Sequence, residues 1–341
     1  MRRLTMSLYC GIDLHSNNHV VVVINEEDKR LYEKRLPNDL AETLKALEPF
    51  KDQLISIIVE STFNWYWLVD GLIDHGYNVE LANPTACSQQ YSGLKYSDDK
   101  HDAFWLAHMR RLNILPTGHI YPPELRAVRD LLRRRLQLVG MRSMELTSIQ
   151  NQVWRSTGNR IKTGDIKLKN FTIPYLEGLL LQAAQANLTL YRTLEYEVKQ
   201  IEKTVLKEID LSPEFKVLKT IIGVGDILGM TIMLETGDIN RFATMGNYSS
   251  YCRCVKSVRI SNNKVKGKGN SKSGNKYLSW AFSEAAHFTV RYDDRAKRFY
   301  QRKTSKTNGI IAIRAVAHKL ARASFCMLKN QTEYDSKLAF G

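Results

Sequence analysis

The order of short apolar runs and amphipathic segments over the first 115 or so residues is the feature that most restricts the fold. Runs rich in β-branched residues predict strands, and segments with helical spacing next to capping residues or glycine predict helices. The predicted strands are residues 7–14, 19–25, 30–36, 54–60 and 77–84. The predicted helices are one capped by Asp39, one from about Trp65 to His75 and one from about Asp98 to Leu112. Three strands followed by alternating helices and strands favour a mixed α/β sheet with helices packed on it.

The segments that follow are predicted to be long helices. Residues 122–161 read as a strongly basic helix, and between residues 175 and 209 apolar side chains recur at near-heptad spacing, with Asn187 breaking the seam. About three heptads are the lower limit for predicting a coiled coil. A coiled coil and a helix packed on its own domain therefore both stay open.

The last third of the chain is predicted to be mainly α-helical. Residues 216–242 predict two helices joined by the turn Gly223-Val224-Gly225, and residues from Leu278 onward are again helical. The turn suits a helix-hairpin-helix-like element whose backbone amides meet a DNA phosphate, and equally a plain structural turn. The predicted regions are an α/β domain over residues 1–120, basic helices and a coiled-coil linker over 121–212, and a third domain over 213–341.

The charge of the chain points to a polyanionic partner. Fifty Lys and Arg residues against 35 Asp and Glu give a formal net charge of +15, for which nucleic acid is the first candidate and an anionic membrane surface the competitor. No apolar run reaches the roughly 20 residues that span a bilayer, and the N-terminus lacks the pattern of a signal peptide. The five scattered cysteines suit a reducing compartment. We therefore expect a cytoplasmic protein that does not enter a membrane.

Arginines cluster in the first basic helix. Repeated at helical spacing, they predict a stripe for backbone phosphates, although a solvated basic face is the alternative. The residues are Arg126, Arg129, Arg133, Arg134 and Arg135.

Four acidic residues lie where a metal site could form. Asp13 is on the first predicted strand, Glu60 ends the fourth, and Asp99 and Asp102 share one face at the start of a helix. Several carboxylates are what Mg²⁺ or Mn²⁺ requires, and two such ions can clamp the oxygens of a phosphodiester. The alternative is that acids at a helix N-terminus merely complement its dipole. Spacing alone does not choose between Asp98 and Asp99.

Three stretches that contain these acids resemble the DEDD domain of a bacterial transposase family. The stretches are GIDLHSNNHVVVV, VESTFNWYWLVDGLIDHGY and LKYSDDKHDAFWLA. The family is the one-hundred-and-ten insertion-sequence family, which includes the pilin-gene invertases. The resemblance implies a ribonuclease-H-like (RuvC-like) domain with Asp13, Glu60, Asp99 and Asp102 as catalytic metal ligands. The sequence departs from the family at Phe63, where glycine is usual, and at Ser97-Asp98, which replace Lys-Thr.

The last region resembles the same family. LKTIIGVGDILGMTIMLETGDINRF is similar to its glycine-hairpin segment and KGNSKSGNKYLSWAFSEAA to its basic Gly-Asn motif, and alignment through Tyr251 places Ser261 at the catalytic serine. Ser271 and Ser273 are the alternatives. The usual Gly-Leu-x-Pro is replaced by Arg253-Cys254-Val255-Lys256. Basic residues around the serine would bind the scissile phosphate: Arg259, Lys264, Lys266, Lys268, Lys272 and Lys276.

The resemblance implies an enzyme that cleaves and exchanges DNA strands. Its partners would be donor and target DNA, a structured guide (bridge) RNA from its own element, and further copies of the chain in a dimer or tetramer. Two other functions stay open from the residues alone: a metal-dependent, Holliday-junction resolvase-like nuclease that needs no serine, and a non-catalytic nucleic-acid-binding protein.

Overall fold

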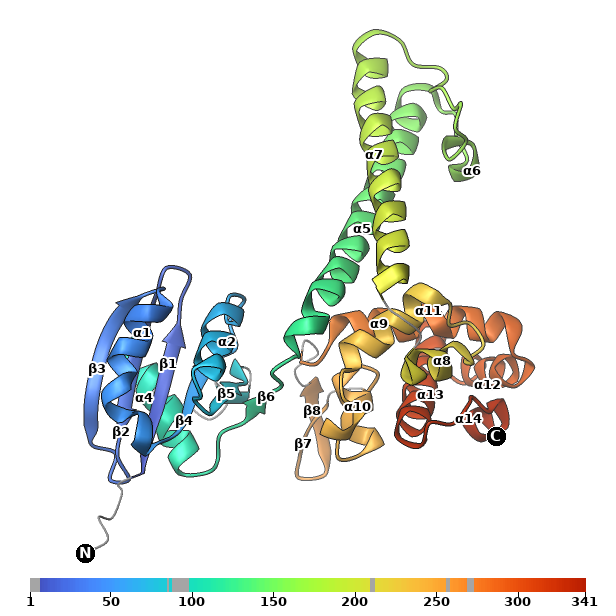
Figure 1. Cartoon of the computed structure of the whole chain (residues 1–341). Coiled ribbons are helices and arrows are strands. Elements are labelled where there is room, and N and C mark those ends of the chain that lie inside the picture. Colours follow the sequence, from blue (N-terminus) through green and yellow to red (C-terminus); the bar gives the residue numbers. More distant parts are fainter. Residues whose placement is uncertain (1–6, 85, 88–97, 209–211, 256–257, 269–272) are drawn as a thin grey trace, which may run out of the picture. The chain divides into compact units, whose positions relative to one another are not determined.

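The computed structural model describes residues 7–84, 86–87, 98–208, 212–255, 258–268 and 273–341, with only the backbone of Arg259, Ile260 and Lys268. The chain divides into two compact units, Met1–Pro123 and Glu124–Gly341 (Figure 1). Within the described residues no helix is both long and apolar enough to cross a membrane.

The first unit is built on a six-stranded mixed sheet. Its order is β3-β2-β1-β4-β5-β6, with β1 antiparallel to β2 and parallel to β4, and β4 parallel to β5. The strands are β1 (Leu8–Leu14), β2 (Asn18–Ile24), β3 (Arg30–Pro37), β4 (Leu54–Glu60), β5 (Val79–Ala82) and β6 (Thr117–Gly118). The five predicted strands are confirmed, whereas β6 has only two residues and leaves no pattern in the sequence.

Helices cover both faces of this sheet. On one face pack α1 (Leu40–Leu47) and α2 (Tyr66–Asp74), and on the other packs α4 (Asp99–Arg111). The Asp39 side chain caps α1 as predicted and accepts a hydrogen bond from the Glu42 amide at 3.0 Å. Helix α1 ends at Leu47, and a 3₁₀ turn, Glu48–Gln53, follows it. Proline near the start of that turn lacks the N–H that would continue the α-helix.

A glycine on β1 allows α4 to lie directly against the sheet. A Cβ atom at Gly11 would lie 1.9 Å from the carbonyl oxygen of Ala103, and Ala103 and Ala107 are fully buried beneath the sheet. Side chains alternate along a strand, so Asp13 faces the same side as Gly11. The small residues therefore bring the start of α4 close to Asp13.

Gly11→Ala is expected to destabilise the first unit by about 3 kcal/mol, because the new methyl group meets helix backbone that cannot move without shifting α4. Differential scanning calorimetry should show a clear fall in the Tm of that unit. At Gly118 a Cβ would have its nearest neighbour at 3.5 Å, so Gly118→Ala is the matched control. An equal Tm for the two variants would contradict the tight β1–α4 packing.

The second unit begins with a long antiparallel helical hairpin. Its arms are α5 (Pro123–Thr157) and α7 (Gly178–Glu208), with the short α6 (Thr163–Ile166) between them (Figure 1). Three side-chain contacts fix the register: Arg135 with Glu202, Arg142 with Glu195, and Ser148 with Asn187. The heptad positions Ala184, Tyr191, Val198 and Val205 are buried. The partner of the predicted heptad helix is therefore α5 of the same chain.

The rest of this unit is a bundle of helices with one small β-hairpin. The helices are α8 (Pro213–Lys219), α9 (Asp226–Thr236), η2 (Ile239–Arg241), α10 (Met245–Tyr251), α11 (Lys276–Tyr292), α12 (Asp294–Thr304), α13 (Gly309–Asn330) and α14 (Ser336–Phe340). Fully buried Tyr248, Phe282 and Leu320 belong to its core. The α/β unit followed by a mainly helical part confirms the predicted architecture at that level.

The predicted glycine turn joins α8 to α9 and packs against α11. Gly223 has a φ of +97°, and a Cβ there would lie 2.7 Å from the Thr289 amide nitrogen. The Thr289 hydroxyl donates to the Ile222 carbonyl at 2.6 Å. Glycine is thus required here by close packing within the unit.

Candidate active site

Two of the predicted acids lie side by side at one edge of the sheet. Asp13 is near the end of β1, Glu60 is the last residue of β4, and the parallel register pairs Ile12 with Val59 just before them. The Glu60 carboxyl is close enough to Asp13 to raise the pKa of Asp13. The carboxyl ends of parallel strands are where open α/β sheets place their ligands.

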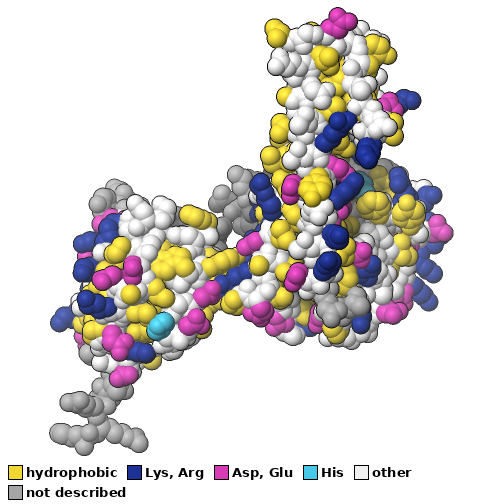
Figure 2. All heavy atoms as spheres, turned by 45° about the horizontal axis from the view of Figure 1, so that its top comes forward, with side chains coloured by type: hydrophobic (Ala, Val, Ile, Leu, Met, Phe, Trp, Pro, Cys, Tyr) yellow, Lys and Arg dark blue, Asp and Glu magenta, His cyan; other side chains and the backbone are white. Residues whose placement is uncertain are grey.

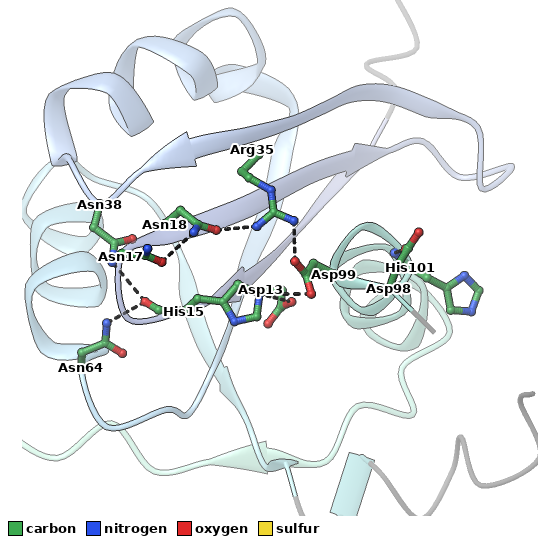
Figure 3. A network of polar contacts seen from close by, with 10 residues as sticks. All are labelled: Asp13, His15, Asn17, Asn18, Arg35, Asn38, Asn64, Asp98, Asp99 and His101. Atoms are coloured by element: carbon green, nitrogen blue, oxygen red, sulfur yellow. Dashed lines mark hydrogen bonds and ion pairs between the residues drawn. The ribbon is translucent and has the colours of Figure 1, made fainter. Parts of the chain in front are cut away.

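The first turn of α4 brings the other two acids to the same place. Asp102 is close enough to raise the pKa of Asp13. Ligand atoms of Asp13, His15 and Asp99 all lie within 4.8 Å of one another (Figure 3). Asp99 therefore lies within ligand distance of Asp13, and Glu60 and Asp102 lie near Asp13; among the described residues, the group whose ligand atoms come this close together is Asp13, His15 and Asp99.

Asp98 and Asp99 have different environments. The Asp98 side chain is the N-cap of α4 and accepts a hydrogen bond from the His101 amide at 2.8 Å. Asp99 turns toward Asp13 and pairs with His15 and Arg35. Of the two neighbours, Asp99 is thus the one that faces the cluster (Figure 3).

Two basic side chains at this cluster were not predicted. The Nε2 atom of His15 lies 3.2 Å from Asp13 Oδ2 and 3.3 Å from Asp99 Oδ1, and Arg35 on β3 pairs with Asp99. The His15 carbonyl accepts hydrogen bonds from Asn38 and Asn64. The two-residue alternation from Asp13 is a signal that could have identified His15, whereas nothing local marks Arg35.

The protonation of Asp13 reflects crowding of negative charge. Burial raises the pKa of Asp13 to about 7; His15 opposes the rise, and Glu60 and Asp102 add to it. A buried carboxyl among others is costly to ionise without a counter-charge. Carboxylate oxygens are the ligands that a hard divalent cation prefers, and Asp13 and Asp99 bring theirs close together beside His15, so the residues present suit a metal centre.

The unusual Phe63 does not disturb this cluster. Its side chain is 85% exposed. The hydroxyl of the preceding residue, Thr62, donates to the side chain of Asn64, which in turn donates to the His15 carbonyl. The backbone of Phe63 is not in the left-handed region that requires glycine.

Ser261 lies at the tip of a β-hairpin in the second unit. The hairpin consists of β7 (Val258–Ser261) and β8 (Lys264–Lys268), and Ser261 pairs with Lys264 across a turn. The turn residues Asn262 and Asn263 both have positive φ, which gives the tight two-residue turn that matches strand twist. Ser261, Lys264 and Lys266 are exposed. Ser273 is also exposed, whereas Ser271 and Lys272 lie outside the described residues.

Arg253, Cys254 and Val255, which belong to the departure from Gly-Leu-x-Pro, come just before this hairpin in the sequence, and Lys256 lies outside the described residues. Arg253 has a φ of +53°, a conformation that favours glycine, and its Nε donates to the Gly274 carbonyl at 2.9 Å. Its own carbonyl accepts from Arg314 at 2.7 Å. The two hydrogen bonds offset the backbone strain, which is of the order of 1–2 kcal/mol for a non-glycine residue.

The five arginines of α5 differ in their surroundings. Arg126 and Arg129 are buried, Arg133 pairs with Glu235 and Arg135 with Glu202, and Arg134 is exposed. An ion-paired guanidinium has less charge to offer a phosphate, so the continuous stripe expected from spacing is interrupted. Figure 2 shows Lys and Arg side chains interspersed with acidic ones on the visible faces of both units. Lys276, at the start of α11, is exposed.

Comparison with known proteins identifies the class and then the family. A model of DEDD transposases of the IS110 type matches residues 10–155, which include all four acids, and the match implies a ribonuclease-H-like fold for the first unit. A second model, described as "Transposase IS116/IS110/IS902 family", matches residues 215–301. The two matches cover about two thirds of the chain. The chain belongs to the IS110 family of transposases.

A curated relative agrees with this assignment. The chain is 23% identical over 145 residues to "Insertion element IS110 uncharacterized 43.6 kDa protein" of Streptomyces coelicolor, a match that covers 42% of this chain. The matched part spans 36% of the relative's length. These comparisons favour neither the resolvase-like nuclease nor the non-catalytic binding protein.

Proposed function

We propose that this chain is the transposase of an insertion sequence and that it cleaves and exchanges DNA strands under the guidance of an RNA. The observation that supports the proposal is the approach of Asp99 to Asp13 at one sheet edge, with Glu60 and Asp102 near Asp13, in a chain whose two matched segments both match transposase models.

The four acids would hold Mg²⁺ or Mn²⁺. Bound there, a divalent ion neutralises the charge that builds on a phosphodiester during cleavage. Burial and the neighbouring acids already make Asp13 difficult to ionise, so the residues gain from a cation. Arg35 partly compensates the negative charge, and both His15 and Arg35 contact Asp99 and orient it.

Ser261 would be the nucleophile. Its Oγ loses a proton and forms a bond to phosphorus while the bond from phosphorus to a sugar oxygen breaks, and that oxygen takes up a proton and leaves as a hydroxyl. The phosphoserine keeps the energy of the phosphodiester, so another strand's hydroxyl can reverse the step and rejoin DNA through a branched intermediate. Lys264 and Lys266 are exposed beside Ser261 and suit contacts to the phosphate backbone, as do Lys276, Arg134 and the sequence positions Arg259, Lys268 and Lys272.

Nucleic acid and further copies of the chain complete the proposal. The net charge of +15 supports binding to donor and target DNA and to a structured RNA from the same element. The acids and Ser261 belong to different compact units, which is compatible with a dimer or tetramer in which one subunit's acids serve another subunit's serine. The Gly223-Val224-Gly225 turn would contact backbone phosphate in a helix-hairpin-helix manner.

The test combines the protein, a duplex with the joined ends of its element, a target duplex, and the transcript of the flanking noncoding DNA. Strand exchange is expected with Mg²⁺ or Mn²⁺, and its rate should fall at least about a thousandfold in EDTA. Product gels and sequencing measure it. Cleavage without rejoining would indicate the resolvase-like nuclease instead, and binding without any strand breakage would indicate a non-catalytic protein.

A further inference from the structure

A buried carboxylate in the second unit has no part in the chemistry described so far. Glu235, near the end of α9, is 5% exposed. Its two oxygens accept hydrogen bonds from Arg133 of α5, at 2.6 and 2.7 Å. One of them also accepts from the side-chain amide of Asn275, at 2.6 Å. Three segments distant in sequence therefore meet at one carboxylate.

Asn275 connects this carboxylate to the hairpin that carries Ser261. The Oδ1 atom of Asn275 caps α11 by accepting hydrogen bonds from the backbone amides of Tyr277 and Leu278. The backbone amide of Asn275 donates to the Tyr251 carbonyl at 2.6 Å. Tyr251–Cys254 and Ser273–Asn275 are the described segments on either side of the hairpin, and we call them its two feet. The bonds Asn275 to Tyr251 and Arg253 to Gly274 join the feet.

The feet approach too closely for any residue but glycine at one position. Gly274 has a φ of +91°, and a Cβ there would lie 2.5 Å from the Tyr251 carbonyl oxygen. Gly274 thus fixes how closely the two feet meet, and the neighbouring Asn275 is in turn held by Glu235. Residues 256–257 and 269–272, which join the feet to the hairpin, lie outside the described residues.

Arg133 extends this connection to the helical hairpin. Its guanidinium lies over the Tyr277 ring, 4.7 Å from the centroid, as well as against Glu235. Two residues along α5, Arg135 pairs with Glu202 of α7. A tilt or rotation of the α5–α7 hairpin would therefore move Arg133, and through Glu235 the foot of the serine hairpin.

Stability alone does not explain such an arrangement. A buried ion pair often stabilises a fold no more than apolar residues of the same shape would, whereas its hydrogen bonds define a single geometry. The bidentate Arg133–Glu235 contact has the geometry that a lysine cannot reproduce.

We propose that Glu235 is a positioning residue for strand cleavage, which links the α5–α7 hairpin through Arg133 and Asn275 to the hairpin that carries Ser261. The inference rests on the proposed function of Ser261. Nucleic acid or another subunit that binds the helical hairpin would act on the serine through this connection.

The test uses Asn275→Ser and Arg133→Lys in the full chain, with Arg142→Lys as the matched control. Serine still caps a helix, so Asn275→Ser removes the bond to Glu235 and keeps the cap. Arg142→Lys weakens the ion pair of the same helix with Glu195, which does not reach the feet. The measurements are the rate and half-saturating DNA concentration of covalent protein–DNA adduct formation, hydrogen exchange at both feet, and Tm, with the element's joined-end duplex and the flanking transcript as probes.

The first two variants are expected to form adduct about ten- to a hundredfold more slowly, since a displacement of about 1 Å can cost that much. The half-saturating DNA concentration should change less than twofold, and exchange at the feet should quicken. Arg142→Lys should keep the wild-type rate within about threefold whatever its Tm. Unchanged exchange at the feet, an unchanged adduct rate, or an equal loss in Arg142→Lys would each overturn the inference. Should Ser261→Ala still form adduct, the proposed nucleophile fails, while exchange at the feet still decides whether Glu235 holds them.

Discussion

Ser261→Ala is expected to eliminate covalent protein–DNA adduct and to lower strand exchange at least about a thousandfold, because no other atom of that side chain can form the bond to phosphorus. Ser261 is exposed at a hairpin tip, so loss of its hydroxyl should leave Tm and DNA affinity unchanged. Denaturing gels with end-labelled joined-end duplex measure the adduct, and mass spectrometry of the DNA-linked peptide locates it.

Two other serines provide the controls for this variant. Ser271→Ala and Ser273→Ala change hydroxyls that lie close in sequence, and both should retain the adduct. If Ser261→Ala retained it and one of these lost it, the nucleophile would be the other serine. If all three single variants still exchanged strands, the serine mechanism would be wrong and a reaction that depends on the carboxylates alone would remain.

Asp13→Asn is expected to abolish two properties together, strand exchange and stabilisation by divalent ion. Wild-type protein at a Mg²⁺ concentration about a hundredfold above Kd should gain about 2.7 kcal/mol, which raises the Tm of the first unit by several degrees. Asparagine cannot carry the charge that attracts the ion, yet it fits the same buried space and relieves the crowding of Asp13 with Glu60 and Asp102. Without metal, the variant should therefore be at least as stable as the wild type.

Asp98→Asn is the matched control for Asp13→Asn. Asparagine caps helices as well as aspartate does, and the Asp98 side chain already serves as the cap of α4. This variant should keep both the Mg²⁺-dependent rise in Tm and most of the activity, whereas Asp99→Asn should lose much of both. Calorimetry in the presence of Mg²⁺, Mn²⁺ and EDTA compares them. If neither Mg²⁺ nor Mn²⁺ changed the Tm of the wild-type protein, that result would contradict a metal centre at these acids.

The first unit could be predicted further than the second. Runs of β-branched residues, such as residues 19–25, predict its strands, because a strand covered on both faces needs apolar side chains at every position. The heptad pattern of α7 was equally clear in the sequence. Such a pattern does not show which helix packs against it, and in the structure that helix is α5 of the same chain. Charge spacing was least informative, since Arg133 and Arg135 look alike in sequence and have different ion-pair partners.

The sequence by itself determined five strands of the first unit and the longer helices, and it placed Asp13 and Glu60 on strands of that unit, because hydrophobic period and capping chemistry are local properties of the chain. Only the tertiary structure decided that Asp99 rather than Asp98 faces the cluster, that His15 and Arg35 join it, and that Glu235 holds the foot of the serine hairpin. Those contacts join residues up to about a hundred positions apart, and they depend on how closely packed elements approach, as at Gly11 and Gly274, which no local pattern encodes.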